Sequence, residues 1–115
     1  MALRSLLLAF GCMTMGAGAC ATSRSDESRE FQGIFSHGFE ADVFKPCGSG
    51  EQWWATLPSD AIAKYNTMVE PYQPVMVRVR GTISERGRSG HLGRYDRYLT
   101  VDTVLIMQPA AAARC

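Results

Sequence analysis

Residues 31–46 read Phe-Gln-Gly-Ile-Phe-Ser-His-Gly-Phe-Glu-Ala-Asp-Val-Phe-Lys-Pro and carry a strong strand pattern. Its apolar side chains of one parity are Phe31, Phe35, Phe39, Ala41 and Val43. This period of two is typical of a β-strand with one buried face. Gly33 and Gly38 interrupt the strand and indicate bends or bulges. We therefore predict one long, bent first strand that wraps around a small barrel.

Shorter strands follow this first one. Residues 47–50 form a glycine-containing turn, and residues 52–57 predict a second strand, so that the pair makes a hairpin. Trp53 and Trp54 are adjacent in that strand and face opposite sides, so we expect one in the core and one at the rim. Residues 75–83 alternate cleanly, with Val75, Val77, Val79 and Ile83 inward and Met76, Arg78, Arg80 and Thr82 outward.

One short helix and a last strand complete the pattern. Ser59 is a good N-cap for an amphipathic helix that two prolines close. In residues 96–107 the apolar parity changes between Val101 and Val104, which predicts a bulge near Asp102 or burial on both faces. Several strands, one helix and no βαβ pattern indicate a mainly all-β fold. We predict a small OB-type barrel, with a loose sandwich as the alternative.

The N-terminus reads as an export signal. Residues 1–19 combine one early positive charge, an apolar run and a run of small residues, and this hydrophobic run is too short to span a bilayer. The small residues precede Cys20 in a pattern that resembles the lipobox of bacterial lipoproteins. We expect Cys20 to carry the lipid, with acylation at Cys12 or plain soluble export as alternatives. Residues 20–30 are polar and charged, and predict a flexible tether.

The cysteine count agrees with this processing. Cleavage before Cys20 removes Cys12 and leaves Cys47 and Cys115, and two thiols in an oxidising compartment are expected to pair. Cys115 ends a short tail, residues 109–115, that follows the predicted 31–108 domain. A redox switch is the alternative for this pair, and a metal site is disfavoured because no CxxC or HxxxH spacing accompanies it.

Composition bounds the function. A chain of 115 residues, 46% hydrophobic and with a formal net charge of +1, excludes a multidomain enzyme, a wholly disordered chain and the simplest nucleic-acid binder. The charge is uneven, because residues 24–70 carry four basic against eight acidic groups, and residues 71–115 carry seven against three. A candidate binding patch for an anionic partner comprises Arg78, Arg80, Arg86, Arg88, His91, Arg94 and Tyr95. The alternative is a solvated face paired with Glu and Asp from the first half.

Catalytic and metal-binding signals are weak. The chain has two histidines, His37 and His91, and neither lies in a triad or beside an acid pair, so we expect no enzyme and no cofactor. His37 lies on the apolar parity of the first strand and is expected to be structural. His91 lies in a glycine-rich loop, where it could orient the loop or contact a partner. Both are weak metal candidates, because no ligand spacing supports them.

A set of short segments in a fixed order carries a resemblance. The segments are 33–35, Val43-Phe-Lys-Pro-Cys-Gly48, Trp53-Trp54, Val77-Arg-Val-Arg-Gly81, Gly90-His-Leu-Gly93, Tyr95 and Leu99-Thr-Val101. Over about residues 31–108 they resemble the C-terminal OB domain of the NlpE envelope lipoproteins, and more closely the stand-alone bacterial lipoproteins built from that domain. Cys115 stands where that domain tends to end with the partner of its first cysteine.

The resemblance implies an outer-membrane lipoprotein facing the periplasm, connected with envelope stress, surface sensing or copper homeostasis. The family also has an N-terminal domain with a CxxC pair, which this sequence lacks, so roles assigned through that domain do not carry over. We expect a non-enzymatic, membrane-anchored binding or sensor module for an envelope protein, an anionic glycan or a lipid head group, and no nucleic acid. A copper-handling lipoprotein that uses His37, His91 and methionines is the alternative.

Overall fold

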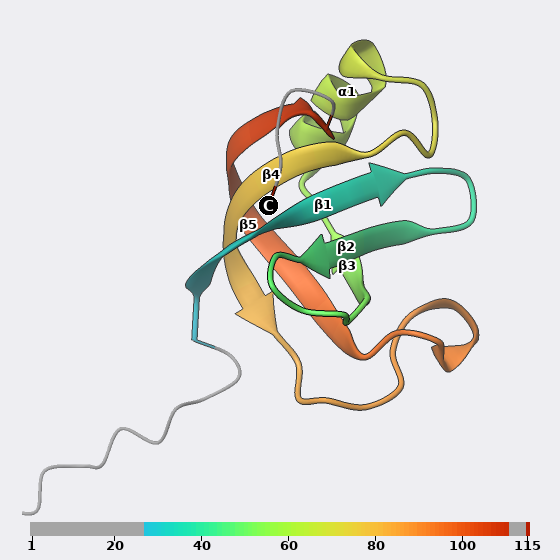
Figure 1. Cartoon of the computed structure of the whole chain (residues 1–115), viewed down its shortest axis with the longest axis vertical. Coiled ribbons are helices and arrows are strands. Elements are labelled where there is room, and N and C mark those ends of the chain that lie inside the picture. The colour runs from blue at the N-terminus through green and yellow to red at the C-terminus, as the bar shows by residue number, and fades with distance from the viewer. Residues whose placement is uncertain (1–26, 111–114) are drawn as a thin grey trace, which may run out of the picture.

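The computed structural model describes residues 27–110 and 115 and shows a closed five-stranded barrel with one helix (Figure 1). The elements are β1 (Arg29–His37), β2 (Asp42–Pro46), β3 (Trp53–Thr56), α1 (Ser59–Met68), β4 (Val75–Ile83), a short 3-10 helix η1 (His91–Gly93) and β5 (Arg97–Pro109). Around the barrel the strand order is β1-β2-β3-β5-β4, and only β3 and β5 pair in parallel. The predicted mainly-β, OB-type barrel is confirmed.

The prediction of one long first strand is wrong. β1 ends at His37, and β2 returns antiparallel to it, with His37 opposite Asp42. The Gly38 N–H donates to the Ala41 carbonyl at 3.1 Å and closes the turn between them. Phe39, expected to be buried, lies in this turn and is 95% exposed. The reason is local. Gly38 is followed by Glu40 and Asp42, and a glycine with acidic residues close by favours a turn, although the apolar alternation continues through it.

The N-terminal boundary also differs slightly from expectation. β1 begins at Arg29, so Arg29 and Glu30, predicted to belong to the tether, are paired with Gly81 and Arg80 of β4. The proposed signal, residues 1–19, and the lipid-bearing Cys20 lie outside the residues that the structure describes.

Inward-facing side chains from the strands fill the barrel, together with Ala61 and Tyr65 of α1. Phe35, Phe44, Val77, Leu99 and Tyr65 of α1 are fully buried. The expectation for the tryptophans is confirmed, because Trp53 is a core residue and Trp54 is half-buried on the outer face. Met76, predicted to face outward, is buried at 8% exposure without joining the main core cluster.

Two bulges bend β5 against β4. The register runs Arg78 with Ile106 and then Val79 with Val104, and later Arg80 with Thr103 and then Gly81 with Val101, which leaves Leu105 and Asp102 unpaired. The predicted bulge near Asp102 is therefore confirmed. Each extra residue shifts the alternation by one position, so both apolar parities of β5 serve the same barrel.

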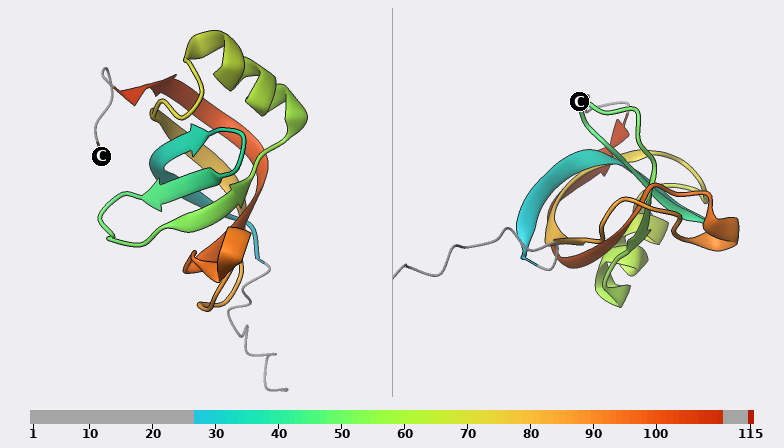
Figure 2. Two further views of the ribbon diagram at one scale, coloured as in Figure 1. Left: turned by 90° about the vertical axis from the view of Figure 1, so that its right-hand side faces the viewer. Right: turned by 90° about the horizontal axis from the view of Figure 1, so that it is seen from below.

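Helix α1 packs across one end of the barrel, as two views show (Figures 1 and 2). Pro58 rather than Ser59 occupies the N-cap position, because the Ala61 and Ile62 N–H groups donate to the Pro58 carbonyl. The predicted Ser59 cap is thus displaced by one residue. In the part of the chain that the structure describes, no helix has the length and apolar character needed to cross a membrane.

A disulfide joins Cys47, directly after β2, to Cys115. It closes a loop of 68 positions and fastens the C-terminal residue to the β1–β2 side of the barrel (Figure 1). The Cys47 N–H donates to the Gln32 carbonyl of β1 at 2.9 Å, so the backbone at this cysteine is held by the sheet itself.

Candidate binding face

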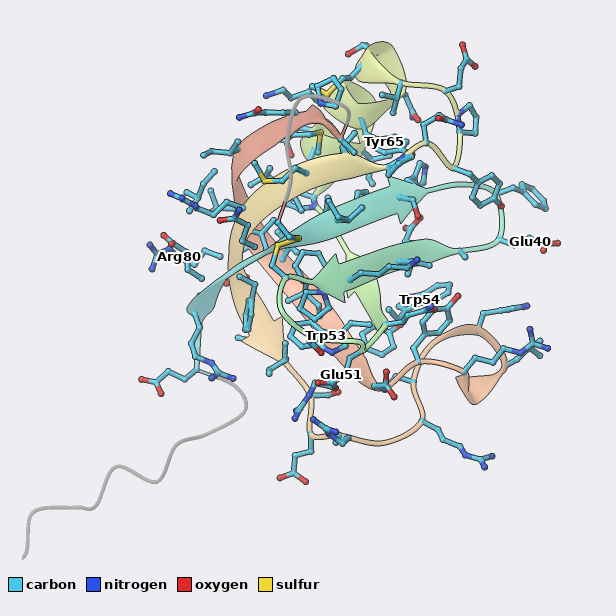
Figure 3. The ribbon with its side chains drawn as sticks, viewed as in Figure 1. Glu40, Glu51, Trp53, Trp54, Tyr65 and Arg80 are labelled. Carbon is cyan, nitrogen blue, oxygen red and sulfur yellow. A yellow bond between two sulfur atoms is a disulfide. The ribbon has the colours of Figure 1, made fainter. Side chains whose placement is uncertain are left out.

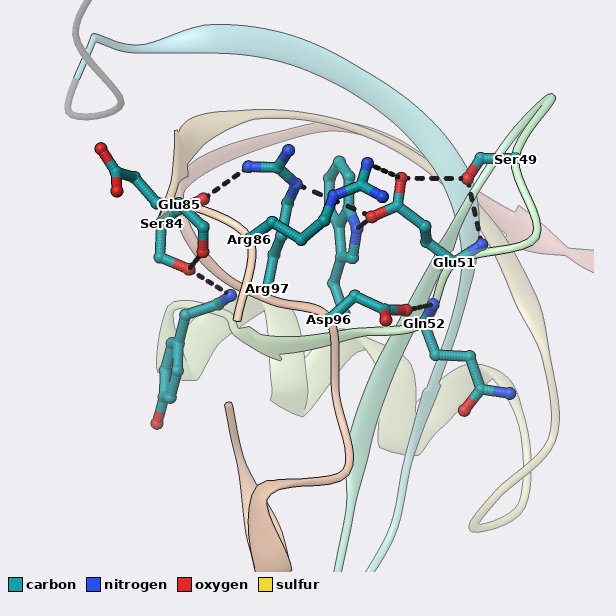
Figure 4. A network of polar contacts seen from close by, with 10 residues as sticks. Ser49, Glu51, Gln52, Ser84, Glu85, Arg86, Asp96 and Arg97 are labelled. Atoms are coloured by element: carbon teal, nitrogen blue, oxygen red, sulfur yellow. Dashed lines mark hydrogen bonds and ion pairs between the residues drawn. The ribbon is translucent and has the colours of Figure 1, made fainter. Parts of the chain in front are cut away.

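The loop between β4 and β5, residues 84–96, contains most of the predicted patch. Glu51 contacts arginines near both ends of this loop. The Glu51 carboxylate accepts hydrogen bonds from Arg86 Nη2 at 3.1 Å and Trp53 Nε1 at 3.4 Å, and Arg97 Nε lies 3.7 Å away (Figure 4). Glu51 and Arg97 are only 23% and 21% exposed as side chains, so this charge network is partly shielded from water. Glu51 could not be predicted from the sequence, because its two arginine partners, Arg86 and Arg97, lie more than 30 positions away in the chain.

A second set of hydrogen bonds fastens the same loop to Gln52, the residue before β3. The Gln52 N–H donates to Asp96 Oδ2, and the Asp96 N–H donates to the Gln52 carbonyl, both at 2.9 Å. Arg97 Nη1 donates to the Ser84 carbonyl at 2.8 Å. Both ends of the loop are therefore tied to strands, so its tip is displayed from a fixed base.

The tip of the loop, residues 88–95, is closed and packed. Ser89 and Tyr95 exchange backbone hydrogen bonds at 2.8 and 3.0 Å. Gly90, at φ 74°, lies so close to Trp54 that a Cβ there would come within 2.6 Å of the Trp54 and Tyr95 rings. Those two rings meet edge to face, 5.2 Å between centroids. The tip of the loop thus packs on Trp54.

The structure divides the predicted patch into two groups. Arg78 and Arg80 lie on the outer face of β4, where Arg80 Nη2 is 3.5 Å from Glu30, and Figure 3 shows Arg80 on the opposite side of the barrel from Trp54. Arg86 is paired with Glu51. Arg80 and Arg86 therefore fit the alternative prediction, a solvated face whose arginines pair with acidic residues from the first half of the chain.

The remaining members gather at the loop tip. Arg88, His91 and Arg94 are exposed, and neither arginine forms an ion pair with any residue in 27–110. The Arg88 side chain lies beside the Gly93 backbone, where a Cβ would be 3.5 Å from the Arg88 Cβ. Leu92, at φ 61°, is 68% exposed between them. The tip therefore presents free positive charge around one apolar side chain.

An aromatic surface adjoins this tip. The register places Val43, Trp54 and Tyr98 side by side on the outer face of β2, β3 and β5. Tyr98 is 41% exposed. OB barrels bind ligands on this β2–β3 face, between the loops that follow β1 and β4. The geometry thus unites Arg88, Arg94 and an aromatic surface on the face that the fold uses for binding.

The histidines do not come together as a ligand set. His37 Nδ1 lies 2.5 Å from Asp42 Oδ1, and its ring packs edge to face on Tyr65. His91 belongs to the separate β4–β5 loop. Within 27–110 and at residue 115, no group of three His, Cys, Asp or Glu side chains could hold a metal ion.

Tyr65 links His37 to the helix end of the barrel. Its hydroxyl donates to the Gln73 carbonyl at 2.5 Å. Burial raises the pKa of Tyr65 above its ordinary 10.0; the nearby Asp42 carboxylate acts in the same direction, and a backbone hydrogen bond at His37 partly offsets both. His37, Asp42 and Tyr65 therefore contact other residues of the barrel, which indicates a structural role.

Comparison with known proteins agrees with the geometry. The family model described as the NlpE C-terminal OB domain matches residues 25–115. Neither a search of curated proteins nor a search of solved structures found a significant match. A family match over most of the chain and a closed five-stranded barrel lead to one conclusion, that the chain belongs to the family of NlpE C-terminal OB domains.

Proposed function

We propose that the protein is an envelope-associated binding module that recognises an anionic envelope component through the tip of its β4–β5 loop. The observation that carries this proposal is the pair Arg88 and Arg94, exposed and free of counter-charges among residues 27–110, on a loop tied down at both ends. The family of NlpE OB domains supports the envelope setting.

The fixed loop makes recognition efficient. Because Glu51 and Trp54 already hold the loop backbone, binding of a carboxylate or phosphate mainly loses the side-chain entropy of the two arginines. Each charge-assisted hydrogen bond contributes about 1.5 kcal/mol or more. Loss of both arginines should then lower affinity by at least about a hundredfold. Trp54 and Tyr98 offer flat apolar surface to the rest of the ligand.

We also propose the anchoring that the N-terminal sequence predicts. Residues 1–19 would be removed and Cys20 acylated, which would hold the barrel at a bacterial membrane, facing the periplasm in the outer-membrane form. Metabolic labelling with a fatty acid tests this step. Label that disappears in Cys20→Ser supports it, whereas label that persists in that variant moves the site to Cys12.

Binding to isolated bacterial envelopes tests the proposed function. The fragment 25–115 spans the family match and every residue that the structure describes, and it lacks the anchor that would itself retain the protein. Retention should fall as salt rises, and the double variant Arg88→Glu/Arg94→Glu should lose it.

Arg78→Glu/Arg80→Glu is the charge-matched control, because both residues are exposed arginines on the outer face of β4, away from the loop. It should bind as the unmodified fragment does. Equal retention of the loop variant and the control would exclude the loop tip as the binding surface.

A further inference from the structure

Phe39 is the most exposed large apolar side chain among residues 27–110, at 95% of its full accessibility. It lies in the turn that joins β1 to β2, residues 38–41, with Glu40 beside it. An aromatic ring held in water contributes nothing to the barrel core, and fully burying such a ring is favourable by about 2 kcal/mol. Packing within the barrel therefore does not explain why an aromatic residue occupies this position.

The turn that carries Phe39 is clamped by Tyr72. The Tyr72 N–H donates to the His37 carbonyl at 2.8 Å, and its hydroxyl accepts the Glu40 N–H at 2.9 Å. A Cβ on Gly38 would lie 2.0 Å from the Tyr72 ring, so only glycine leaves room for the clamp. Tyr72 thus holds the turn at His37 and at Glu40, on either side of Phe39 in the sequence.

Tyr72 makes these contacts from a strained conformation. It has φ 66° in a turn closed by the Gln73 N–H and the Glu70 carbonyl, at a position after Pro71 where glycine is usual. An aromatic residue in the left-handed region is uncommon and costs free energy. The conformation of Tyr72 therefore lowers local stability while it holds the turn. Backbone strain of this kind is found at functional sites.

The Phe39 turn and the β4–β5 loop project from the same side of the barrel. Figures 1 and 2 show both at that side, and Figure 3 shows Glu40 and Trp54 there, with Arg80 opposite. The two projections carry the apolar side chains Phe39 and Leu92, and opposite charges, Glu40 on one and the free arginines on the other. The aromatic surface of Trp54 and Tyr98 lies on the same outer sheet face.

We propose that this side of the barrel docks a folded protein, with Phe39 inserted into an apolar pocket and carboxylates of the same partner opposite Arg88 and Arg94. The proposal rests on the proposed function, because it assigns a partner class to that binding face. A glycan offers no pocket for two separate apolar side chains. An anionic membrane would attract Arg88 and Arg94 but repel Glu40, whereas a folded protein can place an opposite charge against each of them.

Site-specific photo-crosslinking of the full chain in bacterial cells tests the proposal. Benzoylphenylalanine replaces Phe39, Leu92 or, as the control, Arg78. We expect adducts from positions 39 and 92 to contain one and the same protein, identified by mass spectrometry, and position 78 to lack it. Adducts with lipid alone, no adducts, or different proteins at the two positions would overturn the proposal.

Affinity for the identified protein gives the second measurement. Phe39→Ser should weaken binding at least about tenfold, as expected for a buried aromatic anchor, and leave thermal unfolding unchanged because Phe39 is outside the core. Tyr72→Gly keeps the left-handed backbone and the N–H bond to the His37 carbonyl but removes the hydroxyl that accepts the Glu40 N–H, and should weaken binding with Phe39 still present. Undiminished binding of Phe39→Ser contradicts the inference.

The two proposals fail in different ways. If Arg88→Glu/Arg94→Glu loses envelope retention while position 39 crosslinks to no protein, the anionic ligand stands and the protein partner does not. If retention is unaffected and position 39 crosslinks to a protein, the basic tip is not the recognition element.

Discussion

At the scale of single residues, Tyr65 couples the barrel's stability to pH. Its raised pKa means that the folded state favours the neutral phenol, whereas the unfolded chain ionises near 10.0. Its contribution to stability is therefore complete below pH 10 and is lost as pH rises from there towards the raised folded pKa. Denaturant unfolding at about pH 8 and about pH 11 measures the effect.

Tyr65→Phe separates the phenol from the other tyrosines. At neutral pH this variant should lose about 1 kcal/mol, because the bond to the Gln73 carbonyl is gone. The alkaline loss of stability should be smaller than in the unmodified protein. An identical alkaline loss in both proteins would show that Tyr65 does not cause it.

The close packing of Gly81 against β5 leads to a second prediction about a single residue. A Cβ at Gly81 would lie 2.2 Å from the Thr100 carbonyl oxygen, a backbone atom that cannot move without disturbing β5. Gly81→Ala should therefore destabilise the barrel by about 2 kcal/mol or more. Gly87→Ala, with nothing within 4 Å of the added carbon, should leave the unfolding midpoint almost unchanged. Similar midpoints for the two variants would refute the close-approach argument.

At the scale of elements, Glu51 is what makes the β4–β5 loop a fixed structure. Glu51→Gln keeps the shape but removes the charge that Arg86 and Arg97 share. We expect faster hydrogen exchange at the Gly87, Ser89 and Tyr95 amides, which bond within the loop region, with a loss of about 1 kcal/mol in global stability. Glu85→Gln removes an equal charge from the loop without a side-chain partner in the described contacts, and exchange should stay slow there. Equal exchange in both variants would exclude Glu51 as the anchor.

The elements also show what sequence patterns can predict. Clean alternation in residues 75–83 predicted β4 with its true bounds, and the parity change in β5 predicted the bulge at Asp102, because burial of one sheet face leaves a direct mark on residue order. The same rule failed at Phe39, where alternation continued into a turn. Charge summed along the chain predicted one patch, but ion pairs between segments far apart in the sequence divide it, and such pairs have no local signature.

At the scale of the whole molecule, the Cys47–Cys115 disulfide ties the C-terminal residue to the start of the barrel. Closing a loop of 68 positions removes chain entropy worth roughly 4 kcal/mol from the unfolded state. The double variant Cys47→Ala/Cys115→Ala should therefore unfold at a markedly lower temperature. Reduction of the unmodified protein should lower its unfolding temperature by a similar amount. A reductant that leaves the unfolding temperature unchanged would contradict this role.

The proposed function requires that the barrel binds through the side that displays the β4–β5 loop tip. Modification of arginines with phenylglyoxal, read by mass spectrometry on fragment 25–115 with and without isolated envelopes, tests it without any mutation. Exposed arginines react freely, and those covered by a partner do not. We predict that envelopes protect Arg88 and Arg94 and leave Arg78 as reactive as before. Protection of Arg78 with undiminished reaction of Arg88 and Arg94 would place the binding surface on the opposite side and contradict the claim.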